Sequence, residues 1–205
     1  MTEPTIVDLE DPTRFDLLVT LGLNDIAAFA KEYYWQRRSW VTVAHVAFSL
    51  LTVVVWIMAG IRGHYSADRW LTTFGNSVLT FFILLPIHEG IHGLVYKIAG
   101  AADVRYGGSL KKVYAYAIAH RFVANGRVFA WVAAMPFIVI NTALIIAALT
   151  IPAYRFILLG ILMFHTAGTS GDCAMLNLLW LNRDHDIYTF DDANAHASYF
   201  YRSRL

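Results

Sequence analysis

Two histidines and a glutamate lie within about one helical turn in the segment LLPIHEGIHGLV, residues 84–95. In a helix, His88 and His92 occupy positions i and i+4 on one face, so both imidazoles can reach a single metal ion. Glu89 then lies beside that ion rather than on it, where it can exchange a proton with water. This spacing is the His-Glu-x-x-His signature of zinc proteases, in which a third ligand comes from elsewhere in the chain.

The composition around this motif predicts a membrane protein. Of the 205 residues, 58% are hydrophobic and 15% are charged, which is too apolar for an ordinary soluble domain of this length. The net charge of +1 excludes a nucleic-acid-binding function, because no basic face is available to neutralise a phosphate backbone. The acidic N-terminus lacks an apolar core behind a basic start, so it is not a cleavable signal peptide.

Four stretches are long enough to cross a hydrocarbon core as helices, which takes roughly 20 apolar residues. They cover residues 40–61, 70–99, 128–150 and 154–181. The second and fourth are longer than a span requires, which predicts tilting or local unwinding, with Pro86 and residues 168–171 as the expected places. The predicted fold class is an all-α membrane protein, with cytoplasmic segments at residues 1–39 and 182–205.

The basic residues predict that both termini are cytoplasmic and that the chain is a multi-pass protein of the cell membrane. Of the 16 lysines and arginines, three lie on the far side of the spans and the remaining 13 on the side of the N-terminus. The second and fourth spans then both run towards the cytoplasm. His88 and His92 lie roughly 12 to 18 Å of helix before the end of one span, and Asp172 roughly 14 Å before the end of the other. This common depth makes Asp172 the expected third ligand.

Glu89 and Asp172 are also the two acidic residues of the four predicted spans. An acidic residue at mid-bilayer costs about 3 kcal/mol on insertion scales, so its presence there indicates a function. The simplest alternative is a buried polar patch in which His88, Glu89 and His92 hold helices together by hydrogen bonds.

Two further elements are predicted outside the spans. Residues 24–39 begin with the capping residues Asn24 and Asp25 and carry an apolar stripe, which suits a helix lying along the inner membrane surface. A cytoplasmic extension of the first span fits this segment equally well. Residues 102–120 alternate with a period of two on either side of two glycines, which predicts a small cytoplasmic β-hairpin between the second and third spans.

Other polar residues have structural interpretations, and most have a functional one as well. His165, two turns before Asp172, fits an alternative ligand or a hydrogen-bond donor to a reaction intermediate, and also a helix-packing histidine. His45 is alone in its span and fits packing. Cys173 fits a thiolate ligand or, more commonly, a small buried residue. The C-terminal acids and histidines suit a second cation site or a solvated cap. These residues are Asp184, His185, Asp186, Asp191, Asp192 and His196.

These motifs resemble the core of the site-2 protease class of intramembrane zinc metalloproteases, and above all the small multipass group described as putative zincin peptidases. The resemblance covers about residues 70–190. It rests on HEGIHG at residues 88–93, on Pro136 and Asn141 in AAMPFIVIN, and on Gly171-Asp172. The resemblance implies that Asp172 is the third zinc ligand, although Ser-Gly-Asp replaces the usual Leu-Asp-Gly setting. It also implies a supporting role beside the ligands for Asn141.

The predicted function is hydrolysis of a peptide bond by a membrane-embedded zinc protease. Zn²⁺ held by His88, His92 and Asp172 activates water, and Glu89 serves as general base and then protonates the leaving amine. His165 and Asn141 are candidates for a second shell or an oxyanion contact. The expected partners are the lipid bilayer and a membrane-protein or membrane-associated peptide substrate, held extended at the open edge of the hairpin.

A noncatalytic metal-binding or transport protein is the alternative function. A hydroxylase or desaturase fits less well, because its two irons need histidines in several boxes.

Overall fold

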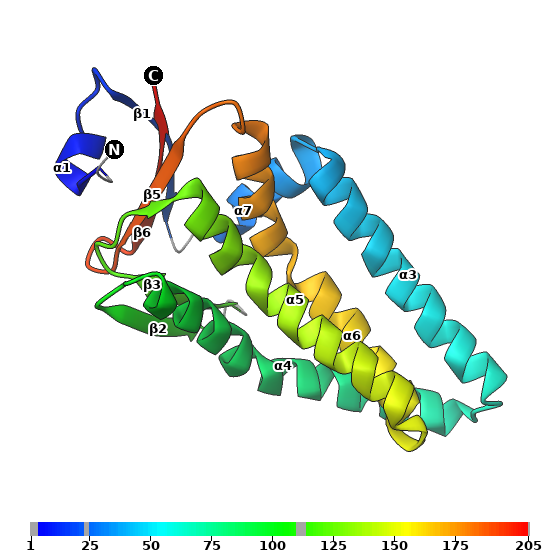
Figure 1. The fold of residues 1–205 in the computed structure, drawn as a ribbon. Helices are drawn as coiled ribbons and strands as arrows, with labels where there is room; N and C mark the ends of the chain where they lie inside the picture. The colour runs from blue at the N-terminus through cyan, green and yellow to red at the C-terminus, as the bar shows by residue number, and fades with distance from the viewer. Residues whose placement is uncertain (1–3, 23–24, 110–113, 205) are drawn as a thin grey trace.

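The computed structural model describes residues 4–22, 25–109 and 114–204. It has an elongated helical part, with two small sheets gathered at one end of it (Figure 1). Both chain termini lie at the sheet end (Figure 1).

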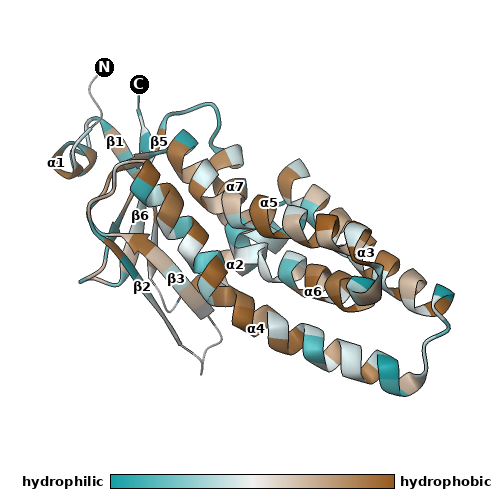
Figure 2. Cartoon of the chain, turned by 60° about the horizontal axis from the view of Figure 1, so that its bottom comes forward, coloured by the Kyte–Doolittle hydropathy of each residue, from teal (hydrophilic) through white to brown (hydrophobic). Residues whose placement is uncertain are grey.

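Three helices are long and apolar enough to cross a membrane: α3 (Trp40–Arg62), α4 (Ala67–Ile98) and α5 (Gly126–Thr150). After the short 3-10 helix η2 (Pro152–Tyr154), α6 (Arg155–Gly168) and α7 (Ser170–Leu181) meet the same test as one segment bent by 44°. Figure 2 shows mostly apolar residues along α3, α5 and α6. The chain therefore has three candidate spans, or four when the bent pair counts as one, in agreement with the prediction of a membrane protein.

Local capping explains where these helices begin. The Ser39 hydroxyl accepts a hydrogen bond from the Val41 N–H at 3.1 Å, and the Asn125 side chain accepts one from the Val128 N–H at 2.9 Å. Each cap satisfies a backbone donor that the first turn of a helix leaves free. The observed starts of α3 and α5 lie within two residues of the predicted ones.

The two predicted sites of unwinding had different outcomes. The bend between α6 and α7 lies at Thr169, within the predicted residues 168–171. The prediction of local unwinding at Pro86 was wrong, because α4 remains helical through this proline. A proline removes one backbone hydrogen bond, and the packing of α4 against both α5 and α6 outweighs that loss.

A four-stranded antiparallel sheet joins the two ends of the chain. Its strands follow the order β1 (Phe15–Gly22), β6 (Ala197–Ser203), β5 (Ile187–Asp192) and β4 (Ala124–Asn125). The predicted all-α fold class with one small β-hairpin did not include this sheet. The reason is nonlocal, since Phe15 pairs with Ser203 and Gly22 with Ala197 across most of the chain.

A separate two-stranded ribbon falls within the range of the predicted hairpin. In this ribbon β2 (Val104–Ser109) runs antiparallel to β3 (Tyr114–Ala119), with Val104 opposite Ala119. Residues 110–113 between the strands lie outside the described residues.

The N-terminal segment packs on this sheet end through short helices. After α1 (Ile6–Leu9) and β1, α2 (Ile26–Ala30) continues into a π-helix, η1 (Lys31–Gln36). Phe29 lies against Phe200 of β6, with ring centroids 6.4 Å apart. The predicted cap Asp25 makes no capping hydrogen bond through its side chain, and Asn24 lies outside the described residues.

The interpretation of residues 24–39 as a helical extension of the first span was wrong, because Ser39 is extended and separates η1 from α3. Asn177 of α7 stabilises this junction. Its side-chain N–H groups donate to the carbonyls of Tyr33 and Arg37, each at 2.6 Å, and its oxygen accepts from the Ser39 hydroxyl at 2.5 Å. Asn177 is therefore a structural clamp at the start of α3.

Candidate metal centre

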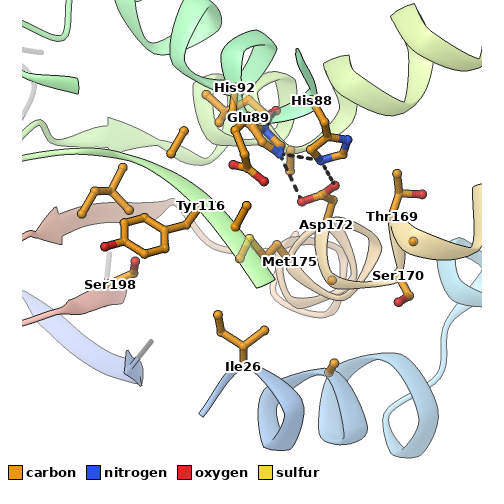
Figure 3. Close-up of a pocket in the computed structure, with 18 of the residues that line it drawn as sticks. Ile26, His88, Glu89, His92, Tyr116, Thr169, Ser170, Asp172, Met175 and Ser198 are labelled. Carbon is orange, nitrogen blue, oxygen red and sulfur yellow. Dashed lines mark hydrogen bonds and ion pairs between the residues drawn. The ribbon is translucent and has the colours of Figure 1, made fainter. Parts of the chain in front are cut away.

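Two helices bring three potential metal ligands together. His88 and His92 come from α4, and Asp172 comes from the first turn of α7 (Figure 3). The His88 Nε2 atom lies 3.1 Å from Asp172 Oδ2, and His92 Nε2 lies 3.4 Å from Asp172 Oδ1. The two Nε2 atoms are 3.1 Å apart. Among the described residues, this is the one group of three or more His, Cys, Asp or Glu side chains suited to holding a metal ion.

The spacing of these atoms fits a zinc ion. Two nitrogen or oxygen ligands at about 2.0 to 2.1 Å from zinc, separated by the tetrahedral angle, lie about 3.3 to 3.4 Å from each other. The three separations in the cluster are 3.1, 3.1 and 3.4 Å. Two imidazoles and one carboxylate also form a ligand set that zinc accepts, with a fourth position left for water or substrate.

The hydrogen bond of His92 orients its ring for metal binding. His92 Nδ1 lies 2.8 Å from the carbonyl oxygen of Val132 in α5. A carbonyl accepts only, so Nδ1 carries the hydrogen and donates. In the neutral ring the lone pair is then on Nε2, which faces His88 and Asp172.

A series of hydrogen bonds through Asn141 and His165 orients His88. The Asn141 amide N–H donates to the Thr166 hydroxyl at 3.1 Å, which leaves its oxygen to accept from His165 Nδ1 at 2.7 Å. His165 Nε2 then accepts from His88 Nδ1, at 3.3 Å. The His88 lone pair therefore lies on Nε2, directed at Asp172. In this arrangement His165 lies behind His88 and outside the ligand cluster, so it is not placed as an alternative ligand.

A family model described as putative zincin peptidase matches residues 81–186, which is 106 of the 205 residues. This chain belongs to the putative zincin peptidase family. The matched segment runs from the second half of α4 to just beyond α7, so it includes the three clustered residues and Glu89. Membership in this family indicates a zinc metallopeptidase. Neither the curated proteins nor the solved structures compared with the chain contain a match.

The zincin site, here meaning His88, Glu89, His92 and Asp172, opens into a cavity of about 690 Å³. The Glu89 side chain points into this cavity and does not join the ligand cluster (Figure 3). Its carboxylate accepts a hydrogen bond from the backbone N–H of Ala117 in β3. Glu89 is therefore close to the metal ligands and also in contact with the edge of a strand.

A second carboxylate, that of Asp191, also lines this cavity, although the sequence suggested a second cation site or a solvated cap for it. Asp191 is buried, and it accepts hydrogen bonds from the Ala119 N–H at 2.9 Å and the Ser198 hydroxyl at 2.5 Å. Burial raises the pKa of the Asp191 carboxyl. Asp191 thus joins β3 to β5 and β6 beside the zincin site.

Neither interpretation of the C-terminal acids and histidines holds in full: the described ones form no second metal site, and Asp191 is buried rather than part of a solvated cap. Asp192 turns away from Asp191, and its carboxylate caps the turn at Asn194 and Ala195. The described C-terminal acids and histidines form no further group suited to a metal ion. Assignment of IYTFDD to a strand would have separated these acids, because neighbouring side chains of a strand point to opposite faces.

His45 has a structural role next to the zincin site. The Thr169 hydroxyl donates to the Thr166 carbonyl at 2.8 Å, so its oxygen accepts from His45 Nε2 at 3.0 Å. The Tyr34 hydroxyl donates to His45 Nδ1 at 2.7 Å. These hydrogen bonds of His45 connect η1 and α3 to the bend that precedes Asp172, which agrees with the prediction of a packing histidine.

Cys173 is buried and its sulfur faces the Val41 carbonyl of α3 at 3.9 Å. It is not part of the ligand cluster. The interpretation of Cys173 as a small buried residue therefore holds, and its interpretation as a thiolate ligand does not.

Proposed function

We propose that this chain is a membrane-embedded zinc protease of the site-2 protease type, which hydrolyses a peptide bond within or next to the bilayer. The observation that carries this proposal is the convergence of His88 and His92 with Asp172, at separations suited to one tetrahedral ion. These ligands come from α4 and α7, both of which belong to candidate spans.

Zinc bound to these three residues would polarise a peptide carbonyl and lower the pKa of water towards about 7. Glu89 accepts the proton of the attacking water and passes it to the leaving amine. The position of its carboxylate supports this role, since it lies in the cavity one residue after His88. Val132 and the Asn141–His165 pair keep the two imidazoles oriented while the proton moves.

The substrate is a membrane-protein or membrane-associated peptide segment in extended form. A helical peptide bond has its carbonyl engaged in a backbone hydrogen bond, so a transmembrane substrate must unwind before cleavage. One edge of β3 pairs with β2, and residues 115–118 of β3 line the cavity of the zincin site. A strand added beside β3 would take over the Ala117 N–H and release Glu89 for proton transfer.

The proposed topology has four spans and both termini in the cytoplasm, in the cell membrane. The α6–α7 pair forms the fourth span, and its bend places Asp172 inside the helical part. Large apolar side chains on the outside of the helices support lipid contact, including Leu50, Val54, Leu71, Leu79 and Leu149. The sheet end, including the β2–β3 ribbon, then lies at the cytoplasmic surface, where the basic residues concentrate.

The test combines metal analysis with proteomics. Purified wild type should contain one zinc per chain, and Glu89→Gln should keep that zinc, since Glu89 is not a ligand. Cells carrying Glu89→Gln should lack membrane-protein fragments that the wild type produces. The matched control is Glu10→Gln, the same change at an exposed residue. If Glu89→Gln produced the wild-type fragments while His88→Ala lost zinc, the chain would be a metal-binding protein without proteolytic function.

A further inference from the structure

A second cavity, of about 670 Å³, lies where the helical part meets the sheet end. Its walls come from the first residues of α3 and α5, the last turn of α7 and the start of β5. None of the residues that line it also lines the cavity of the zincin site. It is therefore a separate cavity, at the level where three candidate membrane helices begin or end.

The charged side chains of this second cavity favour an anion. Arg127, Arg183 and His185 line it, and the one carboxylate in the lining belongs to Asp186. Within the described parts of the chain, neither arginine lies within ion-pair distance of a carboxylate. The Arg127 side chain is exposed at the start of α5, where the helix dipole adds partial positive charge. Two guanidinium groups that form no ion pair with a described carboxylate thus line one cavity.

Apart from Asn125, the remaining lining is aromatic and apolar. Trp40 and Trp180 pack edge to face with ring centroids 5.0 Å apart, and the Arg183 guanidinium lies 4.9 Å from the centroid of the Trp180 ring. The apolar wall is formed by Val41, Ala130, Leu176 and Leu179. Tryptophan and arginine at the ends of membrane helices mark the depth of lipid headgroups. A phosphate near the arginines would leave an acyl chain free to follow the apolar wall into the bilayer.

We propose that the second cavity binds the headgroup phosphate of an anionic phospholipid from the cytoplasmic leaflet. This inference rests on the membrane embedding in the proposed function and does not depend on zinc or on proteolysis. A free phosphate ion would use the arginines but not the apolar wall. A zwitterionic choline headgroup would bring a further cation towards two arginines, so an anionic headgroup is favoured.

The site also connects to the zincin site through two helices. The start of α5 carries Arg127, and Val132 of the same helix accepts the hydrogen bond that orients His92. The first turn of α7 carries Asp172, and its last turn carries Trp180. A lipid held between these two helix ends would stabilise the pair of helices that support the metal ligands.

The test uses the full-length protein, delipidated in a nonionic detergent, and native mass spectrometry with three probes: phosphatidylglycerol, phosphatidylcholine and inorganic phosphate. We expect retention of phosphatidylglycerol over phosphatidylcholine. The double variant Arg127→Gln/Arg183→Gln should retain phosphatidylglycerol roughly 30-fold less well, about fivefold for each arginine. The matched control is Arg62→Gln/Arg69→Gln, at the other ends of candidate membrane helices, which should behave as wild type.

Three outcomes would overturn the inference. They are equal retention of the two lipids, unchanged retention in the Arg127/Arg183 double variant, and displacement of the lipid by equimolar inorganic phosphate, which would indicate a site for soluble anions. Arg127→Lys/Arg183→Lys is the control for misfolding, because it keeps both positive charges and should retain most of the phosphatidylglycerol that the glutamine variant loses. A protein that binds zinc and cleaves substrate without preferring phosphatidylglycerol would refute the lipid site alone.

Discussion

Replacing Asn141 with leucine would test how the structure orients His88. Leucine is similar in size to asparagine but cannot accept the hydrogen bond from His165 Nδ1, which is 2.7 Å long in the wild type. His165 then loses the partner that keeps its Nε2 atom as the acceptor for His88. The lone pair of His88 Nε2 is no longer held towards Asp172, so zinc should bind less tightly.

The expected magnitude follows from the position of Asn141 behind the ligands. Loss of an outer hydrogen-bond partner of a metal-binding histidine typically weakens metal affinity by about 10- to 100-fold, or about 1.4 to 2.7 kcal/mol. The buried His165 N–H left without an acceptor also costs about 1 to 3 kcal/mol of folding stability. Zinc affinity would be measured in detergent by competition with a chromophoric chelator, and stability by thermal unfolding of the metal-free protein.

Two controls make this prediction specific. Asn76→Leu is the same change at an exposed position of α4, and it should leave zinc affinity within about twofold of the wild type. In a double-mutant cycle, Asn141→Leu should have little further effect on zinc affinity once His165 is leucine, because both act through His88. Wild-type affinity in Asn141→Leu, or additive effects in the cycle, would refute the proposed chain of hydrogen bonds.

Three further predictions concern the surroundings of the zincin site. His45→Leu removes the hydrogen bond to Thr169 and should lower both the midpoint of thermal unfolding and zinc affinity; unchanged values for both would show that the bend does not depend on it. Ala117→Pro removes the backbone N–H that donates a hydrogen bond to Glu89, and it should reduce cleavage by about tenfold or more while zinc content stays constant. Undiminished cleavage would exclude strand addition at β3. Hydrogen bonds from the guanidinium groups of Arg204 and Arg202 lower the pKa of Asp16, so its stabilising effect is complete above about pH 4 and is lost as the pH falls through the lowered pKa. The unfolding midpoints of wild type and Asp16→Asn should therefore differ at pH 7 and converge at lower pH.

The helices and the first part of the zincin site were predictable because the information is local. The periodicity of α-helices alone places His88 and His92 on one face, and the length of an apolar stretch shows where α3, α4 and α5 lie. The approach of Asp172 to the two histidines could also be predicted. A rise of about 1.5 Å per residue gives the distance of each residue from the end of its helix, and these distances were similar.

The interpretation of Pro86 failed for the opposite reason. A proline has a known local effect, but whether a helix unwinds there depends on what packs around it, and α4 packs against both α5 and α6. The secondary structure of the C-terminal segment likewise depends on a partner that is distant in the sequence. Its aromatic and acidic residues became β5 and β6 because β1, near the other end of the chain, provides a matching edge.

The His-Glu-x-x-His motif and the apolar helices are readable in the amino-acid sequence without a structure. Each follows from the regular geometry of one helix and from the thickness of a bilayer. Only the folded chain shows which side chains orient the ligands, where the cavities lie and that a sheet joins the two ends of the chain. Contacts such as His92 with Val132, or Asp191 with Ala119, depend on how separate elements pack, and no local pattern encodes that packing.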